Sequence, residues 1–295
     1  MAGALEISLE FPIDKYDRME ILGYGAYGTI YLYKQRWDDF SDKVLPLKES
    51  VLPNFIAVKT FGSEHYFQIE KKNLDMIGSK GQEHPNLVKI YGWCKLPNYI
   101  FGIVMEKFDT NLKLFIHDQR LKNKSIDLDM TRNILHQLAK ALKFLVEKNI
   151  VHRDLKPENI LIRNADNNIQ VAITDLGVSR MITNTEKSNM TYEGTNQWMA
   201  PEVQECGSTY GHPADVFSFG LIAMFIKAGA NPINKNDSST EKYEEWIHKK
   251  ERFLEDDQLI DLIKQCLMHN PKQRPRKPFC IFFQKDLSTH IQINY

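Results

Sequence analysis

The chain reads VHRDLKPEN at residues 151–159, a short loop sequence that combines an acid, an amine and an amide. The carboxylate of Asp154 can accept or orient a hydroxyl group, and the ammonium group of Lys156 can neutralise charge on a phosphate. The amide oxygen of Asn159 is the kind of hard ligand that magnesium prefers. These three side chains stand at the offsets that a loop transferring a phosphoryl group requires.

A second acidic motif follows at residues 174–177, which read Thr-Asp-Leu-Gly. It comes after an apolar strand expected at 169–173, and its carboxylate lies 21 residues beyond Asp154. Asp175 can bridge magnesium to phosphate oxygens, and Gly177 lets the backbone turn sharply. An isolated Asp-Leu-Gly sequence is common in turns that have no function, but its position at the end of a strand favours a metal-binding role.

Three glycines, Gly23, Gly25 and Gly28, form a GxGxxG pattern in the first part of the chain. The same pattern occurs in dinucleotide-binding folds, where the glycines open a helix. Here they lead into residues 29–33, whose branched and aromatic side chains predict a strand. A glycine loop between two strands can lie over a triphosphate, with its backbone N–H groups facing the phosphate oxygens.

Lys59 ends the next apolar strand, and its ammonium group is a candidate ligand for the α- and β-phosphates of a nucleotide. A lysine at a strand end is most often simply solvated, so this role depends on the glycines before it and the helix after it. Glu70 is the expected acidic partner, because it shares a helix face with the apolar Phe67 and Leu74. Asp75 stays open as the alternative partner, although its shorter side chain is expected to point outward.

The pattern of side chains divides the chain into a strand-rich first part and a helical second part, which indicates two lobes. Branched and aromatic residues predict five strands in the first part, at 19–22, 29–33, 55–59, 87–91 and 99–105. One helix interrupts them, from Ser63 as N-cap to Gly78 as stop. Apolar residues at helical spacing predict three helices in the second part, at 128–149, 214–228 and 257–268. Residues 37–54 are polar, contain two prolines and are expected to form a loop insertion.

The composition narrows the class of protein. The 295 residues suffice for one large domain or a closely packed pair of lobes. Thirty-eight basic and 38 acidic residues balance, which gives no support for binding nucleic acid or an anionic membrane. The four cysteines are far apart, which argues against a zinc site or disulfide framework and indicates a reducing compartment. No apolar run is long enough to span a membrane, and residues 1–6 lack the features of a signal peptide. We therefore expect a cytoplasmic protein.

Taken in chain order, the motifs resemble those of a eukaryotic protein kinase domain, from about residue 16 to residue 285. The matching residues are Gly23, Gly25, Gly28, Ala57, Val58, Lys59, Glu70, His152, Arg153, Asp154, Asn159, Asp175, Leu176, Gly177, Ala200, Pro201, Glu202, Asp215 and Arg274. The resemblance implies a bilobal α+β fold. A small, mainly antiparallel β N-lobe with one key helix would occupy 16–105, a hinge 106–109, and a larger, mainly helical C-lobe 110–285. Residues 1–15 would form an N-terminal extension and residues 286–295 a C-terminal tail.

The resemblance also implies that ATP and Mg2+ bind between the two lobes, with Asn159 and Asp175 holding the magnesium ions. Ala57 and Leu161 would contact the adenine, and Asp109 would approach the ribose. The residues implied to contact the nucleotide are Gly23, Gly25, Gly28, Ile30, Ala57, Lys59, Met105, Glu106, Phe108, Asp109 and Leu161.

Four side chains are implied to take part in catalysis, which in this family consists mainly of positioning and charge neutralisation. Asp154 would orient the substrate hydroxyl, and Lys156 would neutralise charge on the transferred phosphoryl group. Lys59, fixed by Glu70, would hold the phosphates that are not transferred.

Lys156, two positions after Asp154, and Thr195 resemble residues of the serine/threonine-specific members of the family, which implies protein substrates bearing Ser or Thr. Thr191 lies four residues before Thr195, where the family often carries an activating phosphate. Arg153 could pair with that phosphate and order the loop. Activation would then need an upstream kinase or self-association.

Other positions are implied to support the fold. Glu202 and Arg274 resemble the buried ion pair of the family's large lobe, and Asp215 resembles the residue that anchors the catalytic loop backbone. The chain departs from the family pattern at Leu176, where phenylalanine is more usual, and in the insertion at 37–54.

Two other functions stay open. A pseudokinase that serves as an ATP-binding signalling scaffold would be expected to lack one of the key residues, and none is missing. A small-molecule kinase of related fold is disfavoured by residues 198–202, which suit a platform for peptide substrates. Those residues also resemble the tyrosine-kinase-like group, whereas the hinge and the Asp-Leu-Gly motif resemble stress-sensor kinases of the unfolded-protein response.

Overall fold

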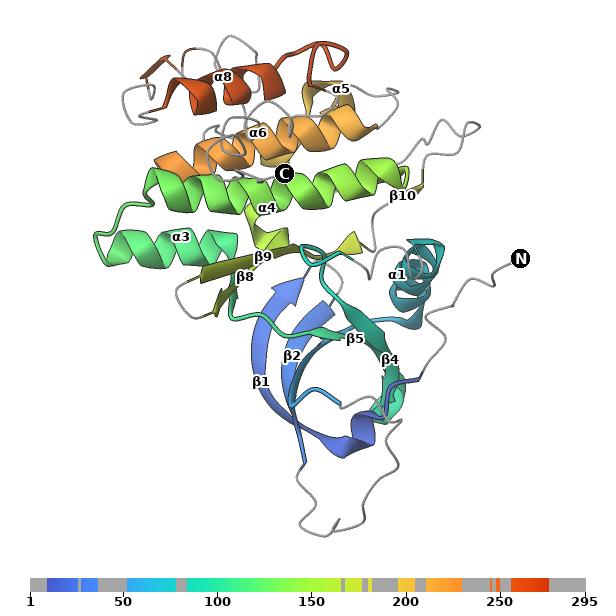
Figure 1. Cartoon of the computed structure of the whole chain (residues 1–295). Coiled ribbons are helices and arrows are strands. Elements are labelled where there is room, and N and C mark those ends of the chain that lie inside the picture. The colour runs from blue at the N-terminus through green and yellow to red at the C-terminus, as the bar shows by residue number, and fades with distance from the viewer. Residues whose placement is uncertain are drawn as a thin grey trace, which may run out of the picture. The chain divides into compact units, whose positions relative to one another are not determined.

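The computed structural model describes residues 10–25, 28–36, 52–77, 84–165, 168–176, 180–181, 196–204, 211–229, 245, 248–249 and 256–275 (Figure 1). The chain divides into two compact units. The first unit comprises Met1–Glu83 and Val88–Lys107, and the second comprises His84–Leu87 and Phe108–Tyr295. The segment His84–Leu87 therefore belongs to the second unit, although in the sequence it lies between two parts of the first.

The first unit contains a five-stranded antiparallel sheet with the strand order β1-β2-β3-β5-β4. Its strands are β1 (Tyr16–Gly25), β2 (Gly28–Gln35), β3 (Phe55–Thr60), β4 (Ile90–Leu96) and β5 (Ile100–Glu106). Two short 3-10 helices, Ile13–Lys15 and Pro97–Tyr99, precede β1 and β5.

The central strand β3 has two different faces. Ile56 and Val58 are fully buried in an apolar core, together with residues of β2, β4 and β5. Ala57 and Lys59 point to the opposite face, because successive side chains of a strand alternate. The alternation of the sequence therefore places Lys59 on the face away from the apolar core.

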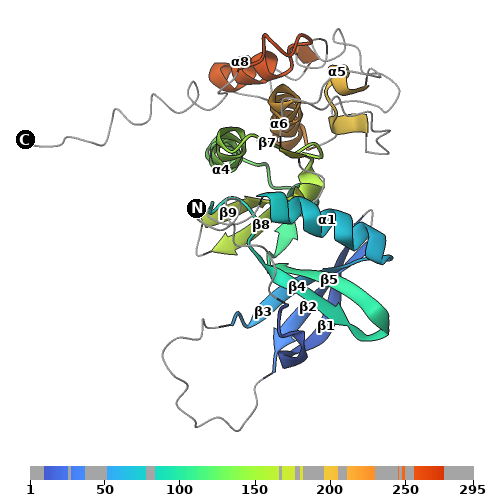
Figure 2. The same cartoon turned by 90° about the vertical axis from the view of Figure 1, so that its right-hand side faces the viewer.

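Helix α1 (Glu64–Ile77) begins directly after Ser63, as predicted, whereas the predicted stop at Gly78 lies outside the described residues. The ring of Phe67 stacks on Phe101 of β5, with 4.9 Å between the ring centroids. Glu70 lies on the same helix face and is 8% exposed. Figure 2 shows α1 running along the strands β4 and β5.

The second unit is mainly helical. Its described helices are α3 (Leu112–Leu121), α4 (Leu128–Glu147), α5 (Pro201–Gln204), α6 (His212–Ala228) and α8 (Asp257–Cys266). A small antiparallel sheet contains β6 (Thr110–Asn111), β8 (Ile160–Ala165) and β9 (Asn168–Ile173), and β7 (Ile150–Val151) pairs with β10 (Arg180–Met181). Two 3-10 turns lie at Pro157–Asn159 and Asn196–Trp198. The predicted α+β class, with strands first and helices later, is confirmed.

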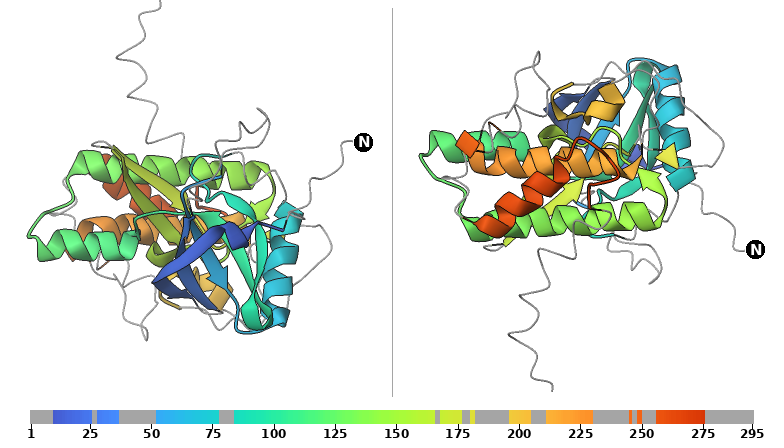
Figure 3. Two further views of the ribbon diagram at one scale, coloured as in Figure 1. Left: turned by 90° about the horizontal axis from the view of Figure 1, so that it is seen from below. Right: turned by 90° about the horizontal axis from the view of Figure 1, so that it is seen from above.

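Caps and apolar faces hold these helices in place. The side chains of Asn111 and Asp127 cap α3 and α4 by accepting hydrogen bonds from backbone N–H groups of the first turn. Helix α6 is buried continuously from Ala214 to Ile226. Seen from above in Figure 3, α6 and α4 run side by side, and α8 crosses them at an angle. Among the helices that the structure describes, none has both the length and the apolar sequence needed to span a membrane.

The structure corrects several predicted boundaries. β4 begins at Ile90 rather than at Leu87, because Leu87 forms a bridge with Ile173 of β9 instead. α4 ends at Glu147, two residues before the predicted end, and Asn149 has a left-handed φ of 58°. α6 begins two residues earlier, and α8 ends two residues earlier, than predicted. Most of the predicted insertion, residues 37–51, falls outside the described part of the chain.

Candidate active site

Lys59 of β3 and Glu70 of α1 form a buried ion pair within the first unit. Lys59 Nζ lies 2.7 Å from Glu70 Oε2 and 2.9 Å from Oε1. The two residues are 6% and 8% exposed. Because breaking a buried pair typically costs about 3–5 kcal/mol, each charge depends on the other. The structure thus brings together the two residues that the sequence predicted to be partners.

Asp75, the alternative partner, makes a different contact. Its Oδ2 atom lies 2.9 Å from the Nζ atom of Lys71, one helical turn earlier on α1. The structure therefore gives Glu70, and not Asp75, the contact with Lys59.

The glycines of β1 and β2 differ in what surrounds them. A Cβ atom added to Gly28 would lie 1.6 Å from Thr60 O, so the close approach of β3 excludes a side chain there. A Cβ atom at Gly23 would meet nothing within 4 Å, and one at Gly25 would make only an ordinary contact of 3.6 Å. Neither Gly23 nor Gly25 has a positive φ. Neither close packing nor a left-handed backbone therefore requires glycine at these two positions.

Other residues implied to contact the nucleotide lie in neighbouring strands of the same sheet. Ile30 is opposite Lys59 across β2 and β3, and Ala57 is opposite Met105 across β3 and β5. Ala57 and Met105 are both buried. Glu106, which ends β5, donates its backbone N–H to Lys89 O at 2.9 Å. The strand register thus gathers Ile30, Ala57, Lys59 and Met105.

Phe108, Asp109 and Leu161 belong to the second unit. Asp109 N donates to Ile162 O at 3.0 Å, and Asp109 Oδ2 accepts a hydrogen bond from Asn164 N at 3.0 Å. The guanidinium group of Arg163 lies 4.3 Å from the centre of the Phe108 ring. These contacts fasten residues 108–109 to β8, the strand that carries Leu161.

The loop before β8 brings Asp154, Lys156 and Asn159 together. Lys156 Nζ lies 2.6 Å from Asp154 Oδ2, and Asn159 Nδ2 donates to the same oxygen at 3.0 Å. Asn159 Nδ2 also donates to Asp154 O at 2.8 Å. Both contacts to the carboxylate use Oδ2, which leaves Oδ1 for a substrate hydroxyl. Both amide hydrogens of Asn159 are used as well, so its amide oxygen is directed away from Asp154.

Asp215, in the first turn of α6, anchors the backbone of this loop as the resemblance implied. Its carboxylate accepts hydrogen bonds from His152 N at 2.7 Å and from Arg153 N at 3.0 Å. Burial raises the pKa of Asp215, while the charge of His152 and the two backbone donors oppose that shift. The ring of His152 extends the network, because its Nε2 atom lies 2.9 Å from Thr174 O.

Two predicted site residues have left-handed backbone conformations. Arg153 has a φ of 74° and Asp175 a φ of 64°, and residues other than glycine rarely adopt such positive φ angles. Thr174 N donates to Asn159 O at 2.9 Å, and this bond ties the Asp175 segment to the catalytic loop. Gly177 and Thr191 fall among the residues whose structure is not described.

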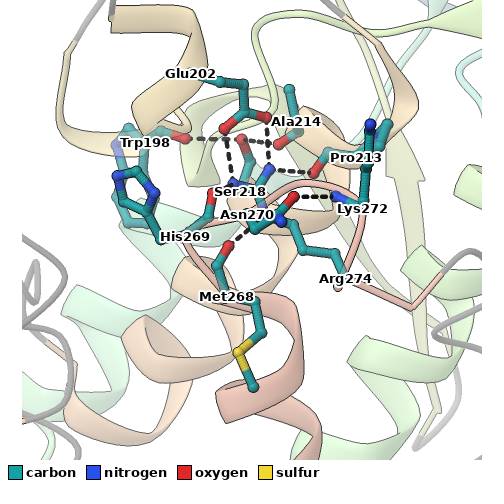
Figure 4. Close-up of polar contacts among 10 residues, drawn as sticks. All are labelled: Trp198, Glu202, Pro213, Ala214, Ser218, Met268, His269, Asn270, Lys272 and Arg274. Atoms are coloured by element: carbon teal, nitrogen blue, oxygen red, sulfur yellow. Dashed lines mark hydrogen bonds and ion pairs between the residues drawn. The ribbon is translucent and has the colours of Figure 1, made fainter.

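Arg274 and Glu202 form the predicted buried ion pair (Figure 4). Nη1 lies 2.6 Å from Oε1, and Nη2 lies 2.7 Å from Oε2. The other three N–H groups donate to the backbone carbonyls of Met268, Pro213 and His269. All five guanidinium N–H groups therefore have acceptors, and the side chain is 0% exposed.

The donor set at Asn159 and Asp175 fits magnesium. An amide oxygen and a carboxylate are hard ligands, and Mg2+ at phosphate sites is usually held by one or two carboxylates plus phosphate oxygens. Among the described residues, no cluster of three or more His, Cys, Asp or Glu side chains could hold a metal by itself.

Sequence reasoning missed three polar residues near this loop. Lys113 of α3 forms an ion pair with Glu158, at 2.7 Å between Nζ and Oε1. Asn86 and Gln137 bond to each other and to β9. Only the sequence His84-Pro85-Asn86 gave a signal, as a polar turn between two apolar segments, because two of the four partners of Gln137 are backbone atoms distant in the sequence.

A comparison with known families agrees with this geometry. The family model described as "Protein kinase domain" matches residues 16–280. The match covers most of the chain, which therefore belongs to the protein kinase domain family.

Curated relatives carry related names. A probable serine/threonine-protein kinase of Dictyostelium discoideum is 29% identical over 265 residues, which is 88% of this chain and 26% of that protein. The dual specificity protein kinase shkD of the same organism is 31% identical over 287 residues, or 96% of this chain and 36% of the relative. Cyclin-dependent kinase-like 1 of Caenorhabditis elegans is 30% identical over 217 residues, 74% of this chain and 56% of the relative. The chain thus spans between 26% and 56% of the length of these relatives.

Proposed function

We propose that this chain is an ATP-dependent protein kinase that transfers the γ-phosphate of ATP to serine and threonine hydroxyls of other proteins. The observation that carries the proposal is the geometry of the catalytic loop. Lys156 and Asn159 both hold Asp154 by one carboxylate oxygen, so the other oxygen faces no competing partner in the loop. The names of the two Dictyostelium relatives support a preference for protein hydroxyls.

Each side chain has a separate part in the proposed reaction. Asp154 Oδ1 accepts the hydrogen bond of the substrate hydroxyl and later its proton. Lys156 neutralises charge on the transferred phosphoryl group, and Lys59, held by Glu70, binds the phosphates that stay behind. Magnesium bound at Asn159 and Asp175 would supply further charge neutralisation on the phosphate oxygens.

The residues proposed to contact the nucleotide come from both units. Gly23, Gly25 and Gly28 provide backbone N–H groups, while Ile30, Ala57 and Met105 line the adenine side. Glu106, Phe108, Asp109 and Leu161 would complete the contacts. The surroundings of Gly23 support this assignment, because no atom of the described residues lies within 4 Å of the position that a Cβ atom would take there.

The proposal is tested by magnesium-dependent transfer of labelled γ-phosphate from ATP, to the protein itself and to a generic basic protein. Asp154→Asn keeps the shape of the side chain and removes the base, so we expect the rate to fall by about 10²–10⁴-fold. Asp129→Asn, an exposed position in the first turn of α4, is the matched control and should keep the wild-type rate.

Equal rates for Asp154→Asn and wild type would contradict the assignment of Asp154. Binding of ATP without transfer in either protein would favour the alternative function, an ATP-binding signalling scaffold. Serine, threonine and tyrosine versions of one peptide would then define the hydroxyl preference of an active enzyme.

We also propose that phosphorylation of Thr191 activates the enzyme. The phosphate would come from an upstream kinase or from a second copy of the chain after self-association. Arg153 supports this proposal, because it lies beside Asp154 and its backbone is fixed by Asp215. A phosphate bound by its guanidinium group would link the loop of Thr191 to the catalytic loop.

The cysteines support a proposed location in the cytoplasm. Cys94 and Cys266 are free thiols and buried. Burial raises the pKa of each thiol to about 12, so both stay protonated and unreactive at neutral pH. Reduced, unpaired cysteines of this kind fit a reducing compartment.

A further inference from the structure

The strand β9 has two edges that are paired in different ways. One edge pairs with β8 over the whole strand, from Ile160 opposite Ile173 to Ala165 opposite Asn168. On the other edge the backbone presents four polar groups: Ile169 O, Val171 N, Val171 O and Ile173 N. Within the described part of the chain, no strand of this sheet, whose order is β6-β8-β9, pairs with this edge, and the one bridge there joins Leu87 to Ile173. Figure 1 shows α4 lying beside this sheet.

The side chain of Gln137, on α4, takes the place of part of a strand. Its Oε1 atom accepts a hydrogen bond from Val171 N at 2.8 Å, and its Nε2 atom donates to Ile169 O at 2.6 Å. An amide group that accepts from one residue and donates to the residue two positions earlier imitates the backbone N–H and C=O of a single residue in a neighbouring parallel strand. Gln137 therefore satisfies the hydrogen-bonding capacity of two of the four polar groups.

Asn86 forms hydrogen bonds with the other two polar groups of this edge. Its Nδ2 atom donates to Val171 O at 2.8 Å, and its backbone oxygen accepts from Ile173 N at 2.9 Å. The second hydrogen on Nδ2 goes to Gln137 Oε1 at 2.9 Å. Asn86 is 6% exposed, so these bonds are shielded from water.

The amide of Gln137 has no spare hydrogen-bonding capacity. Its oxygen accepts from Val171 and Asn86, and its nitrogen donates to Ile169 and to Asn133 Oδ1 at 3.1 Å. An amide has two donor hydrogens and an oxygen with two lone pairs, so all four positions are used. The side chain is consequently held in one orientation.

The strand that Gln137 holds leads directly to the proposed metal ligand. β9 ends at Ile173, and Thr174 and Asp175 follow. Thr174 is fixed to the catalytic loop by Asn159 O and by the ring of His152. The position of the Asp175 carboxylate relative to the Asn159 amide therefore depends on the position of β9, which Gln137 and Asn86 hold on one edge while β8 holds it on the other.

We propose that Gln137 is a positioning residue, which acts through β9 to hold Asp175 at the distance from Asn159 that magnesium requires. The inference deepens the proposed function and rests on it for the role of the metal. It predicts that loss of the Gln137 amide weakens magnesium-dependent nucleotide binding more than it weakens nucleotide binding as such. Partners behind metal ligands typically matter by about 10–100-fold in metal affinity.

The test compares wild type, Gln137→Met and Gln137→Glu in two measurements. The first is hydrogen exchange of residues 168–176 in the protein without metal or nucleotide. The second is the ratio of the ATP dissociation constants measured without and with magnesium. Methionine keeps the length of the side chain and removes all four hydrogen bonds. Glutamate keeps the acceptor for Val171 N and loses the donor to Ile169 O.

We expect exchange of residues 168–176 to be about tenfold faster in Gln137→Met, as loss of these bonds would permit. We expect the magnesium effect on ATP binding to shrink by about tenfold or more. Gln137→Glu sets a carboxylate oxygen against the acceptors Ile169 O and Asn133 Oδ1, so both measurements should change in the same direction as in Gln137→Met. Lys140→Met, at an exposed position of the same helix, is the matched control and should leave both unchanged.

A merely structural role would lower the unfolding temperature of Gln137→Met but leave the magnesium effect at its wild-type size, and that result would overturn the inference. So would a wild-type protein whose ATP affinity does not depend on magnesium. If the wild type binds ATP with magnesium but transfers no phosphate, the proposed kinase activity fails while the inference about Gln137 is still decided by the same two measurements.

Discussion

Single residues in the glycine loop have different physical reasons for lacking a side chain. Gly28 is required by the fold, since a Cβ atom would lie 1.6 Å from Thr60 O. Gly23 is required neither by packing nor by its backbone angles. The sequence alone cannot distinguish a glycine that the packing requires from one that it does not, because all three positions show the same residue.

The distinction predicts opposite results for two alanine substitutions. Gly28→Ala should lower the free energy of unfolding by about 1–3 kcal/mol, as other overpacked substitutions do. Gly23→Ala should change it by no more than about 0.5 kcal/mol. Gly23→Ala should instead raise the KM for ATP about tenfold, because the added methyl group would take space proposed for a phosphate, and tenfold corresponds to about 1.4 kcal/mol. Urea unfolding and steady-state kinetics on both variants provide the measurements, and an unchanged KM in Gly23→Ala would contradict the phosphate role.

The sequence predicted residue contacts well where one regular element decides the direction of a side chain. Glu70 was preferred over Asp75 because of helical spacing and the shorter side chain of Asp75, and its contact with Lys59 is present. Gln137 could not be chosen in this way. Its partners Ile169 and Val171 are backbone groups more than 30 positions away, and backbone groups carry no signal in the sequence.

At the scale of helices and strands, boundaries were predicted to within about two residues wherever a cap or a long apolar face was present. The start of α1 after Ser63 is an example. The expected strand at 87–91 was wrong at its beginning, because Leu87 forms a bridge with Ile173 of β9, within the second unit, and β4 starts only at Ile90. Tertiary hydrogen bonds decided that boundary, and local side-chain preference did not.

The ion pair of Arg274 and Glu202 connects three elements, since its bonds reach α5, the start of α6 and the turn after α8. Lysine in place of arginine would keep the charge but could serve at most three of the five acceptors. Arg274→Lys should therefore lower the free energy of unfolding by about 3–5 kcal/mol. The exposed Lys272→Arg, the reverse exchange two residues earlier, should stay within about 0.5 kcal/mol of wild type. Equal urea midpoints for Arg274→Lys and wild type would show that the network is dispensable.

At the scale of the whole molecule, the order of motifs along the chain predicted the family, and the match over residues 16–280 bears this out. The division into two units was also foreseen, but the membership of His84–Leu87 in the second unit was not. The sequence gives only the order of the motifs along the chain. Which unit His84–Leu87 belongs to depends on where its hydrogen-bond partners lie, and these are in the second unit.

Regulation by Thr191 would act on the whole molecule. Thr191→Ala should lower the rate of phosphate transfer to an external substrate by about 5–150-fold, the range typical of coupling between two sites. Thr183→Ala, in the same loop, is the matched control. Arg153→Gln should have little additional effect in Thr191→Ala, because both changes remove the same contact. Full activity of Thr191→Ala after incubation with ATP and any upstream kinase would sink the proposal.

The outer edge of β9 also protects the protein against self-association. A strand with unpaired N–H and C=O groups is a template on which another chain can add a strand and begin to aggregate. In β9 the four groups already have partners in Gln137 and Asn86, so a second molecule would have to displace both before it could pair. The same two residues that hold a strand in place thus block the addition of a further strand.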